Sequence, residues 1–330
     1  MTLAERIQQH WRTPTAVSLA LTPFSLVYGL VTKIRKAAYI SGVLKTHRFD
    51  IPVVVVGNLT VGGTGKTPFV ITLAERLKIR GWRPGIVSRG YRGKVTEAEI
   101  VPADGDPHHF GDEPVLVARK TGLPVAVARR RAQSVEKLLN ESVDIVISDD
   151  GLQHYAMARS AEIVMVDGIE GLGNGFLLPA GPLREPPARL ASADIRVRRG
   201  GEASEGEYSV TAALGSARNL VSGEEASLDE FRDVPLAALA GIHRPERFFD
   251  LLRQHGLTIS AHPFPDHHQF CAADIPAEMT VLMTEKDAVK CGRFASDRCW
   301  SVSQVTEIPE ELIDKLESVI HQTGQVNLSA

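Results

Sequence analysis

The sequence predicts an α/β protein with a doubly wound, mostly parallel sheet and a second, smaller α/β domain. Apolar strand-like segments alternate with helix-like segments from residue 51 to residue 199, a pattern typical of parallel sheets with helical crossovers. A second strand–helix succession starts at residue 234. The length of 330 residues also exceeds that of one typical domain, so we expect about two domains.

Composition is that of an ordinary globular protein. Hydrophobic residues make up 43% of the chain, and the net charge of −3 argues against a general nucleic-acid-binding protein, so no nucleic-acid partner is expected. The three cysteines, Cys271, Cys291 and Cys299, contain no C-x-x-C pair. They therefore indicate neither a disulfide framework nor a zinc site, and a reducing cytosolic environment fits best.

The N-terminal segment, residues 1–48, combines basic charge with a long uncharged stretch. Seven lysines and arginines face a single glutamate, and no charged residue lies between Arg12 and Lys33. A helix of that length would span about 30 Å, although we expect Pro14 and Pro23 to interrupt it. The basic residues beside the apolar stretch predict a membrane-associating helix, either interfacial or marginally spanning. The alternative is an amphipathic helix packed on its own domain.

The first domain, predicted over residues 49–200, opens with a strand, a glycine-rich turn and a helix. Residues 51–56 are an unbroken apolar run, which favours a strand buried on both faces. The turn covers residues 57–65, and apolar residues then recur at helical spacing. Glycines let backbone N–H groups approach phosphate oxygens, and the helix start adds unpaired donors. This context predicts a phosphate-binding loop of the P-loop NTPase type, with Thr60 where the standard pattern has Gly.

The loop predicts a site for ATP and Mg²⁺. Lys66 is expected to reach the β- and γ-phosphates, where its charge would also serve catalysis, and Thr67 to offer its hydroxyl to Mg²⁺. The alternative is a glycine-rich turn that binds nothing, which the lysine, the threonine and the strand–helix context argue against. The predicted nucleotide-binding residues are Thr60, Val61, Gly62, Gly63, Thr64, Gly65, Lys66 and Thr67.

Two helix starts in this domain carry further candidates. Residues 111–114 open a helix that Asp112 could simply cap. Residues 129–131 are three adjacent arginines at the start of another helix, where they oppose the helix dipole. We therefore expect at least one of them, with Arg131 as the candidate, to face an anionic ligand. The alternative is a solvated basic face.

A hydrophobic strand over residues 143–150 ends in two carboxylates, Asp149 and Asp150. P-loop proteins hold Mg²⁺, directly or through water, from this position. We predict that Asp150 binds the metal and that Asp149 is catalytic, with Glu185 as a weaker metal candidate. Aspartates in an ordinary turn are the alternative.

The remaining chain is predicted to form a linker over residues 201–232 and the smaller domain over residues 233–330. Residues 208–214 could form a connecting strand within the linker. Further strands are predicted at residues 85–88, 161–167, 193–197, 234–242 and 280–283.

The set of motifs resembles the tetraacyldisaccharide 4′-kinase family, the lipid A 4′-kinases of lipopolysaccharide assembly. The matching stretches cover most of the chain beyond residue 50, and their joint occurrence is far more specific than the loop alone. The departures are Arg92, where a glycine is common, and His243 with Arg244, where a small and a polar residue are expected. The stretches are Asn58 to Pro68, Ser88 to Tyr91, Gly111 to Pro114, Asp149 to His154, Leu177 to Pro186, Ala240 to Phe249, Asp266-His267 and Thr284 to Lys290.

The resemblance implies ATP- and Mg²⁺-dependent phosphorylation of the 4′-hydroxyl of a tetraacyldisaccharide 1-phosphate lipid A precursor, at the cytoplasmic face of the bacterial inner membrane. It also implies a catalytic dyad across the domain cleft, with Asp112 as the base and His267 orienting it. A helix cap for Asp112 and a solvated turn for His267 are the alternatives, and His268 replaces His267 if the register is shifted. The predicted substrate-binding residues are Tyr91, Arg131, Gln153, His154 and Arg184.

Two other functions are compatible with a phosphate-binding loop. One is a soluble P-loop kinase or ligase of a small metabolite, similar to dethiobiotin synthetase, which the uncharged stretch beside the basic cluster argues against. The other is an ATPase or GTPase switch. The chain lacks the guanine-reading Asn-Lys-x-Asp, and Val61 stands where a partitioning-type loop has a lysine.

Overall fold

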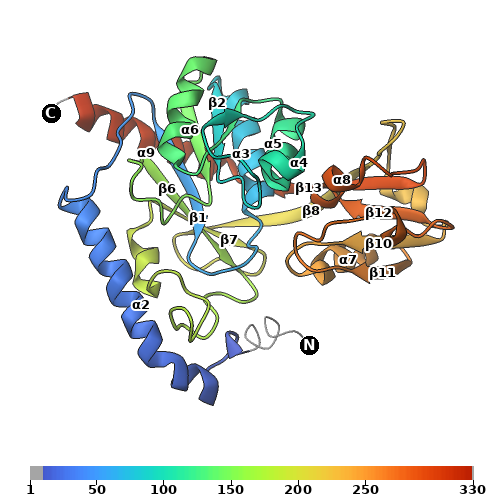
Figure 1. Cartoon of the computed structure of the whole chain (residues 1–330), viewed down its shortest axis with the longest axis horizontal. Coiled ribbons are helices and arrows are strands. Elements are labelled where there is room, and N and C mark those ends of the chain that lie inside the picture. Colours follow the sequence, from blue (N-terminus) through green and yellow to red (C-terminus); the bar gives the residue numbers. More distant parts are fainter. Residues whose placement is uncertain (1–9, 329–330) are drawn as a thin grey trace.

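The computed structural model of the chain describes residues 10–328 and places them in two lobes that share one twisted sheet (Figure 1). Within these residues the sheet has thirteen strands in the order β11-β10-β12-β13-β8-β7-β6-β1-β5-β2-β4-β3, with β9 paired to β8. The first lobe contains β1 (Val53–Asn58), β2 (Pro84–Ser88), β3 (Glu99–Ile100), β4 (Val125–Val127), β5 (Ile145–Asp149), β6 (Ala161–Asp167) and β7 (Ile195–Arg199). The other strands are β8 (Glu207–Asn219), β9 (Glu225–Ala226), β10 (Leu236–Ala240), β11 (Ile259–Pro263), β12 (Thr280–Thr284) and β13 (Cys299–Glu307).

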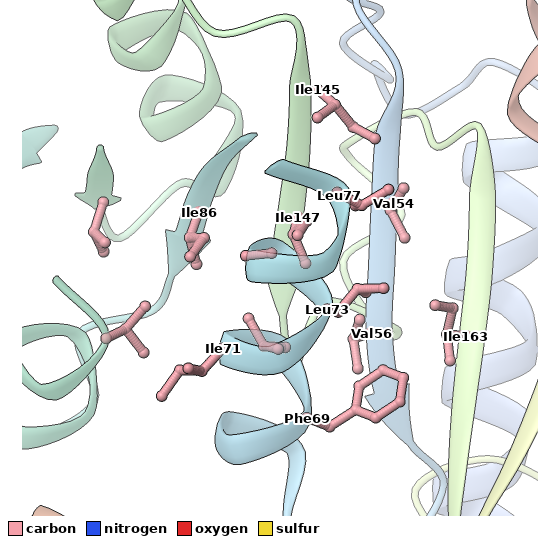
Figure 2. Packing of buried hydrophobic residues seen from close by; sticks show 14 of the residues in the cluster. Val54, Val56, Phe69, Ile71, Leu73, Leu77, Ile86, Ile145, Ile147 and Ile163 are labelled. Atoms are coloured by element: carbon pink, nitrogen blue, oxygen red, sulfur yellow. The ribbon is translucent and has the colours of Figure 1, made fainter. Parts of the chain in front are cut away.

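The first lobe is a doubly wound sheet with β1 near its centre. β1 runs parallel to β5 on one side and to β6 on the other, and its valines are fully buried because helices cover both faces. One face packs against α3 (Lys66–Ile79), α5 (Asp112–Thr121) and α9 (Glu310–Leu328), and the other against α6 (Arg131–Leu138). In Figure 2, Phe69 and Leu73 of α3 lie over Val56 of β1. The predicted strands at residues 85–88 and 161–167 are confirmed.

Strands β8 and β13 join the two lobes. They pair antiparallel along most of their length, with a register shift between Val302 and Gln304. The connecting strand predicted at residues 208–214 is confirmed and is longer, since β8 runs from Glu207 to Asn219. Residues 201–232 therefore contain regular structure as well as loops, and the proposed domain boundaries stay a prediction.

The second lobe is a smaller parallel sheet, β11-β10-β12-β13, flanked by α7 (Pro245–Gln254) and α8 (Glu285–Cys291). Phe248 and Phe249 of α7 are fully buried against the sheet. After β13 the chain returns to the first lobe, where Leu312, Ile313 and Leu316 of α9 are buried in its core. The short helix α4 (Pro107–Phe110) precedes α5 and ends at Gly111.

The N-terminal helix α2 (Ala16–Ile40) lies along one side of the first lobe (Figure 1). The expectation that Pro23 interrupts this helix is wrong, because the helix continues through it. Proline removes one hydrogen bond from a helix but has a backbone angle compatible with it. Ser25 holds the helix in place, since its hydroxyl donates to the Leu177 carbonyl at 2.8 Å and accepts from the Ala180 N–H at 3.0 Å.

Most apolar side chains of α2 are exposed, which is unusual for a helix of this composition. By length and composition alone, α2 is the one helix among residues 10–328 that could cross a membrane. The exposed large apolar side chains are Val17, Leu19, Phe24, Leu26, Val27, Leu30, Val31, Ile34 and Ile40.

Candidate active site

The predicted phosphate-binding loop connects β1 to α3, and it borders a cavity of about 490 Å³ between the lobes. Gly62 and Gly65 have backbone φ angles of 115° and 77°, which residues other than glycine rarely adopt. Gly65 is the N-cap of α3, so the unpaired N–H groups of the helix start point toward the loop. The loop thus has the backbone shape and the dipole that anion binding requires.

Lys66 and Arg184 converge on Asp150 in this cavity. Lys66 Nζ donates to Asn58 Oδ1 at 2.9 Å and lies 3.4 Å from Asp150 Oδ1. Arg184 donates to both carboxylate oxygens of Asp150, at 3.0 and 3.1 Å. Burial alone would raise the pKa of Asp150, but the two cations hold it well below its usual range. Asp150 is therefore an anion between two cations, beside the loop.

Asp149 is the carboxylate that faces Thr67. Its Oδ2 accepts from Thr67 Oγ1 at 3.4 Å, and its buried Oδ1 has no hydrogen-bond partner among the described residues. Burial, together with the nearby carboxylates of Glu113 and Asp150, raises the pKa of Asp149 to about 7. Carboxylate and hydroxyl oxygens are the ligands that Mg²⁺ prefers, and it commonly takes only one or two from the protein. Thr67 and Asp149 therefore fit a magnesium site. Among residues 10–328, no group of three or more His, Cys, Asp or Glu side chains is placed so that it could hold a metal ion.

Glu185 lies in a separate polar network. Its carboxylate accepts from Gln153 Nε2 at 2.9 Å and from the Tyr155 hydroxyl at 2.5 Å, and it lies 3.4 Å from Arg189 Nε. It does not line the cavity that holds Lys66. No contact supports its predicted metal role, which stays a prediction.

Arg131 has a structural task that the sequence did not reveal. Its guanidinium is buried and donates to the backbone carbonyls of Asp149 and Asp150, both at 2.7 Å. Burial lowers its pKa to about 10, so it stays charged near neutral pH. These bonds hold the end of β5 in place and explain why a cation is tolerated at the start of α6. Arg131 also lines the cavity, so its predicted ligand role stays open.

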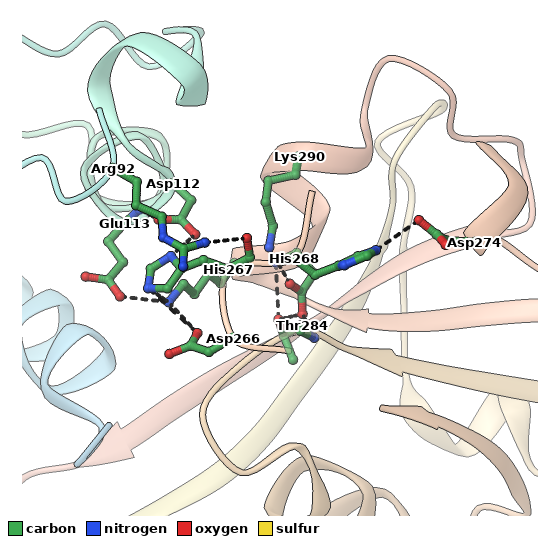
Figure 3. A network of polar contacts seen from close by, with 12 residues as sticks. Arg92, Asp112, Glu113, Asp266, His267, His268, Asp274, Thr284 and Lys290 are labelled. Atoms are coloured by element: carbon green, nitrogen blue, oxygen red, sulfur yellow. Dashed lines mark hydrogen bonds and ion pairs between the residues drawn. The ribbon is translucent and has the colours of Figure 1, made fainter. Parts of the chain in front are cut away.

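Asp112 and His267 meet across the cleft although they are 155 residues apart (Figure 3). His267 Nδ1 lies 2.9 Å from Asp112 Oδ2, and both side chains are largely buried. Gly111 is the N-cap of α5, so Asp112 is not a conventional helix cap, although its Oδ1 accepts the Glu113 N–H at 3.0 Å. Burial would raise the pKa of Asp112, but the hydrogen bond from His267 and the charge of Lys286 lower it. Asp112 is therefore an anion at neutral pH.

The neighbouring His268 has a different environment. Its Nε2 contacts Asp274 at 3.1 Å within the second lobe (Figure 3). His267 itself has a left-handed φ of 60°, and its backbone carbonyl accepts from Arg92 Nη1 at 3.0 Å. The residue that faces Asp112 is thus the one predicted, without a shift in register.

The predicted substrate-binding residues fall into two groups. Tyr91, Arg131 and Arg184 line the cavity, whereas Gln153 and His154 do not. Gln153 donates to Glu185, and burial with the charges of Arg131 and Arg89 lowers the pKa of His154 to about 3. His154 is therefore neutral.

Four residues near the loop were not predicted as site residues, because each comes from an element far from the loop in the sequence and three of them come from the second lobe. Arg199, at the end of β7, packs so closely on Gly65 that a Cβ there would lie 2.5 Å from the guanidinium. His243 lies against Gly62 in the same way. Arg244 and Arg247 of the second lobe pair with Asp167 of the first, at 3.3 and 2.7 Å, and both line the cavity with Arg199 and His243.

These features define a P-loop enzyme that acts on nucleotides. Lys66 and Thr67 lie in a strand–loop–helix, a carboxylate ends the adjacent parallel strand, and a second lobe closes the cavity. Comparison with protein-family models narrows this class. The model of the tetraacyldisaccharide-1-P 4′-kinase family matches residues 17–321, and the chain belongs to this family.

Individual relatives agree over nearly the full length. The chain is 45% identical to tetraacyldisaccharide 4′-kinase of Nitrosococcus oceani, covering 98% of this chain and 96% of the relative. It is 44% identical to the enzyme of Actinobacillus succinogenes, with 94% and 98% covered. Among solved structures, LpxK from Aquifex aeolicus in complex with ATP is 29% identical, with a TM-score of 0.78 over 93% of this chain and 99% of that one.

Proposed function

We propose that this chain transfers the γ-phosphate of ATP to the 4′-hydroxyl of a tetraacyldisaccharide 1-phosphate. The observation that carries this proposal is the set of residues that line or adjoin one cavity. The phosphate-binding loop with Lys66 lines it from the first lobe, and His267 of the second lobe lines it beside the carboxylate of Asp112. The cavity therefore offers a site for a triphosphate. Asp112 does not itself line the cavity, but it adjoins the cavity through His267, where we propose that it serves as a base for an alcohol.

The loop and its neighbours are proposed to hold the nucleotide. Backbone N–H groups from Thr60 to Thr67 would contact the phosphates, and Lys66 would approach the γ-phosphate. Thr67 and Asp149 would hold Mg²⁺, with Asp150 in direct contact or acting through water. Bound there, Mg²⁺ would neutralise charge on the β- and γ-phosphate oxygens.

The anionic Asp112 is proposed as the general base. In the transfer, the acceptor oxygen forms a bond to the γ-phosphorus, the bond from that phosphorus to the bridging oxygen breaks, and ADP leaves. The hydroxyl proton passes to Asp112 and is later released to solvent. His267 donates to Asp112 and holds its carboxylate in a fixed orientation.

The exposed apolar face of α2 is proposed to contact the cytoplasmic leaflet of the inner membrane. Lys33 and Arg35 are exposed near the C-terminal end of this helix, where they could bind anionic head groups. The Tyr28 hydroxyl donates to the carbonyl of Arg184 at 3.3 Å, so the helix adjoins the catalytic cavity. An acylated acceptor could then reach the cavity from the bilayer.

The test is ADP release measured with ATP alone, with the tetraacyldisaccharide 1-phosphate, and with the same disaccharide lacking acyl chains. We expect turnover that depends on the acylated acceptor. Equal turnover without any acceptor would support an ATPase switch instead. A preference for water-soluble metabolites over the acylated acceptor would support a soluble kinase or ligase.

A further inference from the structure

Lys286 is a largely buried cation beside the proposed dyad, and the roles proposed so far for the loop and the dyad do not include it. It lies in the first turn of α8, in the stretch Thr284 to Lys290 of the second lobe. Its Nζ donates to Glu113 Oε1 at 2.8 Å, lies 3.3 Å from His267 Nε2 and lies 3.4 Å from Asp266 Oδ1. An ammonium group has three protons, and here three polar groups from the two lobes surround it.

Lys286 can act only as a donor in this position. Burial lowers its pKa, but the carboxylates of Glu113, Asp112 and Asp266 outweigh burial and raise it above its ordinary value. The group facing it on His267 must therefore accept a hydrogen bond, because two donors facing each other would repel. This requirement leaves Nε2 of His267 without a proton.

The opposite side of the imidazole is fixed by Asp112. An ionised carboxylate has no proton to donate, so the 2.9 Å contact requires a proton on His267 Nδ1. Both neighbours thus select the same form of the ring, which is neutral with the proton on Nδ1.

We propose that Lys286 is a positioning residue that keeps His267 in the neutral Nδ1–H form, and this inference rests on the proposed role of the dyad. The other groups around the ring do not replace it. Asp266 Oδ1 lies 3.7 Å from Nε2 and, as an anion, favours a second proton on the ring. The Arg92 guanidinium contacts the backbone carbonyl of His267, and Tyr91 faces the ring with a centroid distance of 5.2 Å.

The other lysine of α8 is paired with a carboxylate away from the ring of His267. Lys290 pairs with the buried carboxylate of Asp287 at 2.8 Å. Without Lys286, the ring would lie between the carboxylates of Asp112 and Asp266 with no cation on its Nε2 side. It would then take up a second proton more readily, and an imidazolium would weaken Asp112 as a proton acceptor.

The experiment compares Lys286→Met, Lys286→Arg and Lys120→Met in the full-length chain. Lys120 is a matched control, because its Nζ also bridges the lobes, to Glu285 Oε2 at 2.8 Å, but does not contact His267. The ring nitrogens of ¹⁵N-histidine-labelled protein are observed by NMR at neutral pH, and the signal of His267 is assigned by its loss in His267→Gln. Steady-state kcat and KM for ATP are measured in parallel.

We expect the wild type, Lys286→Arg and Lys120→Met to show the Nδ1–H signature. Lys286→Met should show an imidazolium or a mixture of tautomers. Its kcat should fall about 10- to 100-fold, the usual effect of losing a group that orients a functional ligand, while KM for ATP stays within about threefold.

An unchanged Nδ1–H signature in folded Lys286→Met, or the same loss in Lys120→Met, would overturn the proposal. The NMR readout does not depend on turnover. A wrong base assignment would instead appear as near-normal kcat in Asp112→Asn, so the two failures can be told apart.

Discussion

A double-mutant cycle on Asp112 and His267 tests whether they act as one unit. Asp112→Asn removes the negative charge but keeps the shape, and His267→Ala removes the group that bonds Asp112 Oδ2 at 2.9 Å. A positioned general base contributes about 10²- to 10⁴-fold. We therefore expect Asp112→Asn to lower kcat about 10³-fold, or about 4 kcal/mol, and His267→Ala about 10²-fold, or about 3 kcal/mol.

Independent residues would multiply these effects to about 10⁵-fold in the double variant. Residues that act as one unit should leave it close to Asp112→Asn, at about 10³-fold, with a coupling energy near 3 kcal/mol. The assay is phosphoryl transfer with ATP and acceptor both saturating, with nucleotide affinity measured separately to show that the loop is intact. Multiplicative effects would show that Asp112 and His267 act independently, and near-normal turnover in Asp112→Asn would show that Asp112 is not the base.

The same pair should make stability depend on pH. The folded-state pKa of Asp112 is lowered, so the carboxylate stabilises the fold above its unfolded pKa of about 3.9. This contribution is lost as pH falls through the lower, folded value. The difference in unfolding free energy between wild type and Asp112→Asn should therefore be constant near neutral pH and shrink in acid. A difference that grows on acidification would contradict the assigned ionisation.

Further predictions concern the loop, the metal and the N-terminal helix. Lys66→Ala should lower kcat by about two to three orders of magnitude, as expected for a cation aimed at the transferring group. Wild-type turnover of this variant at saturating ATP would exclude the proposed role of Lys66. Asp149→Asn should raise the Mg²⁺ concentration for half-maximal activity, and Asp150→Asn should do so if Asp150 contacts the metal; unchanged titrations in both variants would exclude the site. Leu26→Glu combined with Leu30→Glu should weaken cosedimentation with anionic vesicles and raise KM for the acylated acceptor, with unchanged vesicle binding counting against membrane contact by α2.

Local patterns were enough to predict the central strands and the loop. Four consecutive valines at residues 53–56 strongly favour a buried strand, and the glycines that follow favour a tight loop. By contrast, β13 was not predicted, since Cys299–Glu307 alternates unevenly between polar and apolar residues and is stabilised by pairing with β8 and β12. The predicted interruption at Pro23 was wrong, because the loss of a single backbone hydrogen bond does not end α2.

The site residues also divide into those that the local sequence predicts and those that depend on tertiary contacts. Lys66 and Thr67 were predicted from the strand–loop–helix context, and Asp149 and Asp150 from their place at the end of a neighbouring hydrophobic strand. Both predictions rest on local sequence, because the adjacent parallel strands β1 and β5 hold these residues. The Asp112–His267 pair was predicted by resemblance alone, since no spacing connects residues from two lobes. The stretch Thr284 to Lys290 carries part of the family resemblance. The contacts of Lys286 with Glu113 and His267, however, depend on that same meeting of lobes and cannot be derived from the local sequence.

The proposed phosphoryl transfer is tested most directly by following the γ-phosphate itself. Purified protein is incubated with γ-labelled ATP and either the tetraacyldisaccharide 1-phosphate or an analogue that lacks the 4′-hydroxyl. We expect one labelled phosphate per acceptor, at the 4′ position, and no transfer to the analogue. Labelling of the analogue, or release of labelled inorganic phosphate at the same rate with and without acceptor, would contradict the proposed transfer.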